Sequence, residues 1–217
     1  MTTANKTSGE VLCVKSKPFH DAIHVRHNLM VGDTAVIPFR VTELKDNLVS
    51  VARKNAELDH NYLQVLPYVV MRREDGRILT YRRGKSGTEK KLHDLYSIGL
   101  GGHIDEGIDY DRNKLTTMTL RATIEGNAYR EVLEETGFML SKRNLVPRAC
   151  LVTQDKSDPD AVGWFHMGVL FCITVPEDFT PSSEEDCMKE FEWLTPLELK
   201  QRNLEPWSLA ALAVVNL

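Results

Sequence analysis

The chain has 217 residues, of which 27% are charged and 42% hydrophobic, and its formal net charge at pH 7 is −4. This composition is that of an ordinary globular protein, and the acidic balance argues against nucleic acid as a general partner. No apolar run approaches the roughly 20 residues that span a bilayer, and the polar N-terminus lacks the apolar region of a secretory signal. We therefore expect a cytoplasmic protein without a membrane partner.

Four cysteines are scattered along the chain and form no C-x-x-C pair: Cys13, Cys150, Cys172 and Cys187. Zinc sites and redox-active disulfides usually show such closely spaced pairs. We therefore expect reduced thiols that are mostly buried, and no zinc site.

The N-terminal quarter gives weak signals. Residues 1–9 are small and polar and are predicted to be disordered. A short strand is expected over residues 11–14, whereas residues 18–40 show no clear pattern. Apolar residues recur at helical spacing over residues 41–57, which predicts a helix there. We interpret residues 1–60 as an appendage that is packed against, or swapped onto, a main domain of residues 61–217.

Strands dominate the main domain. Residues 62–71 and 78–82 are predicted to form a hairpin around a Glu-Asp-Gly turn. Further strands are expected over residues 95–100, 146–153, 164–175 and 191–194. Thr195, Pro196 and Glu198 form the pattern of a capped helix start, and a last helix is expected over residues 206–215. Strands outnumber helices in a mixed order, which predicts an α/β or α+β sandwich with a mixed sheet flanked by helices.

One predicted helix is acidic. At 100° per residue, Glu131, Glu134 and Glu135 fall on one face, because positions i, i+3 and i+4 are neighbours. Gly137 is expected to end the helix, since glycine readily adopts positive φ. The apolar residues Tyr129, Val132 and Leu133 fall roughly opposite the acids and are expected to face the core.

Three carboxylates this close repel one another, at a cost of about 0.2–0.5 kcal/mol per pair. A divalent cation that prefers oxygen ligands, Mg²⁺ or Mn²⁺, would make the cluster favourable. For the three acids taken alone, a solvated acidic face is the simpler alternative.

Glycine and basic residues lie near the predicted hairpin. Gly101 and Gly102 end the strand over residues 95–100, and paired glycines let a backbone approach a ligand closely. Basic residues follow the hairpin and are interpreted either as a rim that faces phosphate or as a solvated loop: Arg82, Arg83, Lys85, Lys90 and Lys91.

Several aromatic and histidine side chains also have two interpretations. Trp164 and Phe165 are candidates for stacking on a base, although aromatic residues in a strand more often belong to the core. His103 follows the glycines and is either a substrate contact or a structural residue. His166 is expected in the core or on the sheet surface.

Gly102 and the run from Arg130 to Phe138 resemble the Nudix box, G-x5-E-x7-R-E-U-x-E-E-x-G-U, where U is aliphatic or aromatic. The second half of the box matches at every specified position. In the first half, Ala122 occupies the slot of the first Glu and Gly102 lies too far upstream, which indicates an insertion over residues 108–121. Glu106 and Glu125 are candidates for a substitute carboxylate, although neither fits the spacing. The resemblance covers roughly residues 62–217.

This resemblance implies an α/β/α sandwich that hydrolyses a nucleoside diphosphate linked to another group. By the same resemblance, the metal ligands are Glu131, Glu134, Glu135 and the backbone carbonyl of Gly101. Arg130 would orient the glutamates through an ion pair, and Glu131 or Glu134 would activate water. Arg82, Arg83 or Lys85 would hold the phosphate that is not attacked.

The resemblance has further implications outside the box. An additional base or metal ligand is expected from a loop, with Glu184 and Glu185 as candidates. The expected partner is a nucleotide or nucleoside diphosphate derivative, and homodimers are common in the family.

Two alternatives remain open. The altered first half of the box suits a Nudix domain that senses nucleotides without catalysis, but the intact glutamates argue against it. An isopentenyl diphosphate isomerase shares the fold, but its catalytic cysteine should lie near the glycine pair, and residues 98–103 contain none.

Overall fold

The structure is a computed structural model that describes residues 9–25, 28–84, 92–140, 145–154, 157–158, 161–182 and 188–215. The helices are α1 (Ser16–Ile23), α2 (Val41–Asp46), α3 (Arg53–Ala56), α4 (Thr117–Thr136), α5 (Pro196–Leu199) and α6 (Pro206–Val215). The strands are β1 (Glu10–Lys15), β2 (Leu29–Val31), β3 (Thr34–Ile37), β4 (Leu48–Ala52), β5 (Tyr62–Arg73), β6 (Ile78–Arg83), β7 (Tyr96–Ser97), β8 (Gly99–Leu100), β9 (Pro147–Thr153), β10 (His166–Val175) and β11 (Met188–Leu194). Short 3₁₀ helices cover Arg112–Lys114 and Val162–Phe165.

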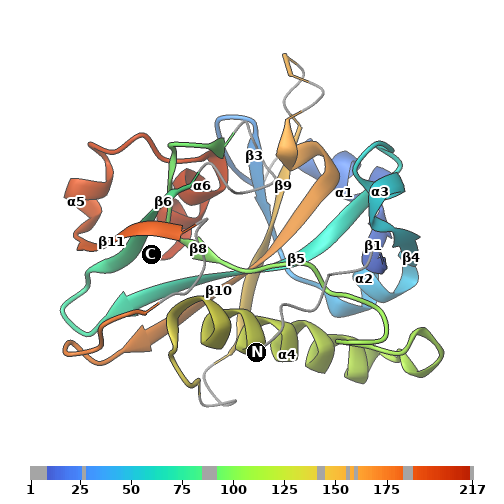
Figure 1. Ribbon diagram of the computed structural model, residues 1–217. Coiled ribbons are helices and arrows are strands. Elements are labelled where there is room, and N and C mark those ends of the chain that lie inside the picture. Colours follow the sequence, from blue (N-terminus) through green and yellow to red (C-terminus); the bar gives the residue numbers. More distant parts are fainter. Residues whose placement is uncertain are drawn as a thin grey trace.

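The described strands form one mixed sheet with the order β11-β6-β5-β10-β9-β3-β2. The long strands β5 and β10 run parallel at its centre, and the other neighbours along this order are antiparallel. Four further strands pair with the sheet outside this order: β1 pairs with β4 and β5, β7 pairs with β6, and β8 pairs with β5. The predicted mixed sheet of an α/β sandwich is therefore confirmed (Figure 1).

Alternation along β5 builds two cores. Val65, Val69 and Met71 point to the face covered by α1, α2 and α4, whereas Tyr68 and Val70 point to the face covered by α6. This is the period of two that an extended strand imposes. Figure 1 shows α4 along one side of the sheet and α6 on the other.

The N-terminal strands belong to the same sheet. β1 pairs with β4 and β5, and the β2–β3 hairpin extends the sheet beyond β9. The helix predicted over residues 41–57 is wrong, because β4 interrupts it. Backbone pairing with β1 outweighs the helical spacing there, and the β-branched residues of β4 pack against β1. The division at residue 60 stays a prediction, and the prediction for residues 1–9 lies, apart from Gly9, outside the described residues.

The hairpin and the helix cap predicted for the main domain are confirmed. The hairpin joins β5 to β6, and Gly76 in its turn has a φ of +88°. The strand expected over residues 95–100 is divided, because β7 pairs with β6 and β8 pairs with β5. Thr195 caps α5, since its hydroxyl accepts from the Glu198 N–H and the Glu198 carboxylate accepts from the Thr195 N–H.

The expected burial of the thiols is confirmed for Cys13 and Cys150, whereas Cys172 is half-buried. Cys13 and Cys150 are buried and free, and burial raises the pKa of each thiol to about 12. Both thiols are therefore protonated at neutral pH. Cys187 lies outside the described residues. In the described part of the chain, no helix has the length and apolar character needed to cross a membrane.

Candidate active site

Helix α4 carries the acidic residues. It begins after Thr116, whose hydroxyl accepts a hydrogen bond from the Thr119 N–H at 3.2 Å, and it ends at Gly137, where φ is +74°. The predicted end is thus confirmed. The start lies inside the stretch 108–121 that the Nudix box pattern marks as an insertion, so that stretch is a loop, a 3₁₀ turn and the first turn of α4.

The three acids of α4 differ in their exposure to solvent. The buried stripe of the helix includes Val132, Glu131 and Glu135, and the two carboxylic residues are 6% and 8% exposed. Glu134 points outward, with a side chain that is 51% exposed. Leu133, expected in the core, is 36% exposed. Two carboxylates therefore lie beneath the sheet, and one lies at the surface.

A glycine pair makes room for the buried carboxylates. A Cβ atom on Gly102 would lie 2.6 Å from the Glu131 carboxylate, so a side chain there would displace this carboxylate. Gly101 has a φ of +156°, and a Cβ atom on it would lie 2.0 Å from the Pro67 carbonyl oxygen. The Gly101 N–H donates to Oε2 of Glu135 at 3.0 Å. The predicted close backbone approach therefore serves the acids of α4.

Arg130 organises the outer part of this cluster. Its Nε and Nη2 atoms donate to the two oxygens of Asp109, both at 3.1 Å, and its Nη1 atom lies 2.8 Å from Glu131 and 3.0 Å from Glu134. Burial alone would lower the pKa of this guanidinium, but the hydrogen bond to Asp109 and the charge of Glu131 raise the pKa above its ordinary value. The arginine thus stays charged and holds three carboxylates.

Asp109 was missed by sequence reasoning. Its side chain is 7% exposed and also accepts from the Asn127 side chain and the Asp105 N–H. The sequence candidates for a substitute carboxylate pair elsewhere: Glu106 with Arg112, and Glu125 with Arg121. Because a loop places Asp109 beside α4, no fixed spacing in the sequence signals it.

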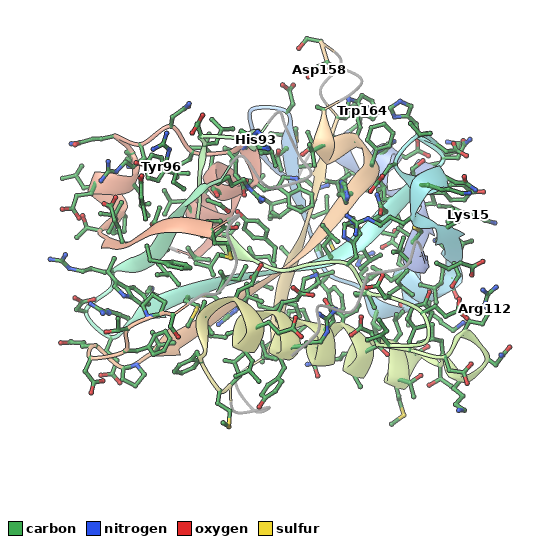
Figure 2. The ribbon with its side chains drawn as sticks, viewed as in Figure 1. Lys15, His93, Tyr96, Arg112, Asp158 and Trp164 are labelled. Carbon is green, nitrogen blue, oxygen red and sulfur yellow. The ribbon has the colours of Figure 1, made fainter. Side chains whose placement is uncertain are left out.

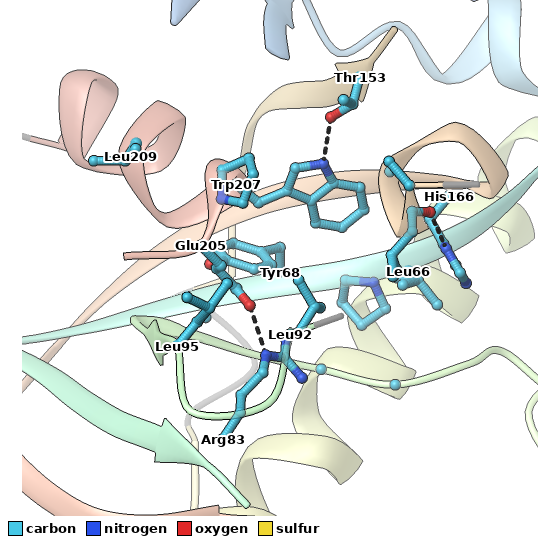
Figure 3. A pocket seen from close by; sticks show the side chains of 18 of the residues that line it. Leu66, Tyr68, Arg83, Leu92, Leu95, Thr153, His166, Glu205, Trp207 and Leu209 are labelled. Atoms are coloured by element: carbon cyan, nitrogen blue, oxygen red, sulfur yellow. Dashed lines mark hydrogen bonds and ion pairs between the residues drawn. The ribbon is translucent and has the colours of Figure 1, made fainter. Parts of the chain in front are cut away.

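Glu131 and Glu135 face a cavity of about 740 Å³. Gly101, Gly102 and His103 also line this cavity, as do Trp207 and several leucines, and Figure 3 shows Trp207 beside Tyr68 and Thr153. Such a volume is that of a site for a small molecule.

Arg83 also lines the cavity and is held by a buried carboxylate. Its Nε atom donates to Glu205 at 2.6 Å, and Glu205 is 2% exposed. Glu205 also accepts from the hydroxyls of Tyr68 at 2.9 Å and Ser97 at 2.7 Å. Burial alone would lower the pKa of Arg83, but the Glu205 charge raises it well above its ordinary value. Among the described residues, no hydrogen-bond partner occupies the Nη atoms of Arg83, which leaves them available to a ligand.

The other predicted substrate-binding residues lie elsewhere. Arg82 alternates with Arg83 along β6 and forms ion pairs with Asp94 at 2.7 Å and Glu190 at 3.2 Å, away from the cavity lining. Lys85 lies outside the described residues, and so do the loop candidates Glu184 and Glu185.

The structure also separates the aromatic candidates. The Trp164 ring meets the rings of His20 and His60, on the side of the molecule where α1 and α3 lie (Figure 2), and Phe165 stacks on His60. The cavity lining instead contains Trp207, from the last helix α6. His103 and His166 both line the cavity, with ring centroids 5.6 Å apart.

The donor set of this site fits a hard divalent cation only in part. Among the described residues, no group of three or more His, Cys, Asp or Glu side chains is arranged to hold a metal ion. The two buried carboxylates, Glu131 and Glu135, nevertheless suit Mg²⁺, which often binds one or two carboxylates and takes its other ligands from water and substrate phosphate.

Comparison with known proteins decides the family. The family model described as the NUDIX domain matches residues 64–214, which is most of the chain. The chain belongs to the Nudix family. Protein YmaB of Bacillus subtilis (strain 168) is 28% identical over 179 residues, which cover 78% of this chain and 81% of YmaB.

A solved Nudix structure extends the comparison. The crystal structure of Tm1382, which is assigned to the Nudix hydrolases, matches with a TM-score of 0.67 and 26% identity and covers 95% of this chain and 98% of Tm1382. Because so little of the chain is left out, the N-terminal strands are part of the fold that the two Nudix proteins share. The family and this structure identify the chain as a hydrolase of pyrophosphate bonds in nucleoside diphosphate derivatives.

A first prediction concerns the contribution of the Asp109–Arg130 ion pair to the activity of this Nudix hydrolase. Asp109→Asn keeps the shape of the side chain but removes the charge that holds Arg130, so kcat/KM should fall roughly 10- to 100-fold, as when an outer partner of an active-site group is lost. Asp111→Asn is the matched control, since Asp111 is exposed and pairs with Lys114. Steady-state kinetics and thermal melting of both variants provide the test, and equal kcat/KM values would contradict it.

Proposed function

We propose that this Nudix hydrolase uses Mg²⁺ or Mn²⁺ to cleave a nucleoside diphosphate that is linked to another group. One observation carries the proposal. The buried carboxylates of Glu131 and Glu135 share a cavity with the guanidinium of Arg83. A diphosphate needs positive charge around its oxygens, and this cavity offers the guanidinium of Arg83 and two carboxylates for a divalent ion.

Each residue has a role in this proposal. Glu131, Glu135 and the Gly101 carbonyl would hold the metal, which neutralises the diphosphate and lowers the pKa of water when it is bound. Glu134 is a further proposed ligand, after its side chain turns away from Arg130. Glu131 or Glu134 accepts the proton of the attacking water while the bond between phosphorus and the bridging oxygen breaks. The products are two phosphate esters, and the bridging oxygen leaves with one of them.

Arg83, rather than Arg82, is the proposed phosphate contact on β6. Two Nη groups of a guanidinium match the spacing of two phosphate oxygens, and Glu205 fixes the plane of this guanidinium through Nε. Arg82 has both of its Nη atoms engaged by carboxylates at the surface.

The test is a hydrolysis screen with protein freed of metal by a chelator and then supplied with Mg²⁺ or Mn²⁺. The panel contains nucleoside triphosphates, dinucleoside polyphosphates, ADP-ribose, nucleotide sugars and capped RNA. We expect turnover of at least one class that falls by two orders of magnitude or more when the metal is removed. Turnover that is unchanged without metal would contradict the proposal.

Two measurements separate the parts of this proposal. Mg²⁺ or Mn²⁺ should raise the melting temperature of the wild type but not of Glu131→Gln, which tests the metal site without using activity. Glu134→Gln tests the third acid, because kcat equal to that of wild type would remove its role. Nucleotide binding without any turnover would favour the sensing alternative.

The homodimer and the cytoplasmic location stay proposals, and light scattering tests the former.

A further inference from the structure

Trp207, at the start of α6, lines the same cavity as Glu131 and Glu135. Its indole N–H donates to the Thr153 hydroxyl at 3.0 Å, and the Tyr68 ring meets it edge-on, with centroids 5.7 Å apart and an interplanar angle of 80°. A Cβ atom on Gly168 of β10 would lie 2.9 Å from a ring carbon of the indole. Trp207 is thus held in one orientation and is only half-buried (Figure 3).

Apolar side chains line the cavity together with Trp207. Leu66, Leu92, Leu95 and Leu209 line the cavity with it, and Leu209 is 43% exposed. An apolar side chain at the mouth of a cavity loses contact with water when a ligand covers it, which favours a ligand that has an apolar part. The same cavity holds Arg83 and the two glutamates. A molecule that fills it therefore needs an anionic part and an apolar part.

The N-terminal strands also contribute to the cavity wall. Val31, Gly32 and Asp33, at the turn between β2 and β3, line the cavity, and β2 and β3 pack against α6. These residues precede the range 64–214 that matches the family. The part of the cavity wall that the β2–β3 turn supplies consequently lies outside the matched range.

We propose that Trp207 and the β2–β3 turn form a subsite for the nucleobase of the substrate, with the planar base stacked on the indole. This inference rests on the proposed function, because it assumes that the diphosphate occupies the end with Arg83. Every base has an aromatic face, so stacking tolerates different bases. Loss of one stacking side chain weakens binding roughly 5- to 150-fold.

Isothermal titration calorimetry in the presence of Mg²⁺ tests the subsite with ADP, UDP and inorganic pyrophosphate. Trp207→Leu should weaken binding of ADP and UDP roughly 5- to 150-fold and change the affinity for pyrophosphate less than twofold. Trp164→Leu is the matched control, because Trp164 lies outside the cavity lining, and it should change none of the three affinities. Val31→Asp replaces an apolar side chain of the β2–β3 wall by a charged one and should weaken binding of the two nucleotides only.

A second measurement does not depend on the stability of Trp207→Leu. The chain has three tryptophans, so only Trp207 emits in the variant Trp164→Phe/Trp193→Phe. ADP should change this emission and pyrophosphate should leave it unchanged. Emission that ADP does not alter, or equal ADP affinities of Trp207→Leu and wild type, overturns this inference alone. A wild type that binds no nucleoside diphosphate overturns both the subsite and the proposed function.

Discussion

Glu135→Gln should lower kcat roughly 10²- to 10³-fold, the loss expected when a group that stabilises charge is removed from a preorganised site. The substitution keeps the size of the side chain and an oxygen that can accept from the Gly101 N–H, which now lies 3.0 Å from Oε2. The negative charge is lost, and this charge is what a divalent ion requires of the 8% exposed Glu135 side chain.

Glu125→Gln is the control for this experiment. Glu125 lies on the same helix, pairs with Arg121 at 2.7 Å and is absent from the cavity lining. Its kcat should remain within twofold of the wild type. Steady-state kinetics at saturating Mg²⁺, with circular dichroism to verify the fold, measures both variants. A kcat of Glu135→Gln within twofold of wild type would remove this residue from the site.

Glu205→Gln should lower the free energy of unfolding by about 3 kcal/mol. Breaking a buried ion pair by removing one partner costs about 3–5 kcal/mol, and the lower end applies because the Arg83 side chain keeps 30% exposure. The amide also brings N–H groups against the donors of Tyr68 and Ser97, which now share the carboxylate oxygen Oε1. At least one donor then loses its acceptor.

The pair of Arg202 and Glu192 provides the control. These side chains lie 2.6 Å apart but are 36% and 34% exposed, so Glu192→Gln should cost less than about 1 kcal/mol. Arg83→Gln combined with Glu205→Gln should be less destabilised than the sum of the single variants, because no unpaired buried charge is left. Urea denaturation measures all four variants. A loss below about 1 kcal/mol in Glu205→Gln would contradict the buried pair.

Elements that depend on neighbouring residues could be predicted from the sequence, whereas an element that depends on a distant strand could not. The end of α4 at Gly137, the β5–β6 hairpin and the cap at Thr195 follow from residues a few positions apart, and all three are present. The helix predicted over residues 41–57 is wrong because pairing of β4 with β1, about 40 positions away, outweighs a local pattern. Local propensity predicts an element only where no distant partner competes for its backbone.

The same difference between local signals and distant contacts applies to the active site. The spacing of the glutamates predicted a helix that carries all three acids on one side, but it did not predict which of them are buried. The glycine pair of another segment leaves room for Glu131 and Glu135 beneath the sheet, whereas Arg130 holds Glu134 at the surface. Which acid meets the cavity therefore depends on packing between segments.

By itself, the sequence determined the family, the mixed sandwich and the acidic helix, because box spacing, strand alternation and capping are written in short stretches of chain. Only the tertiary structure decided which residues meet in the site. Asp109 reaches Arg130 across 21 positions, Trp207 reaches Thr153 across 54, and Arg83 reaches Glu205 across 122. The register of the sheet and the paths of the loops determine these contacts. Neither produces a fixed spacing in the sequence.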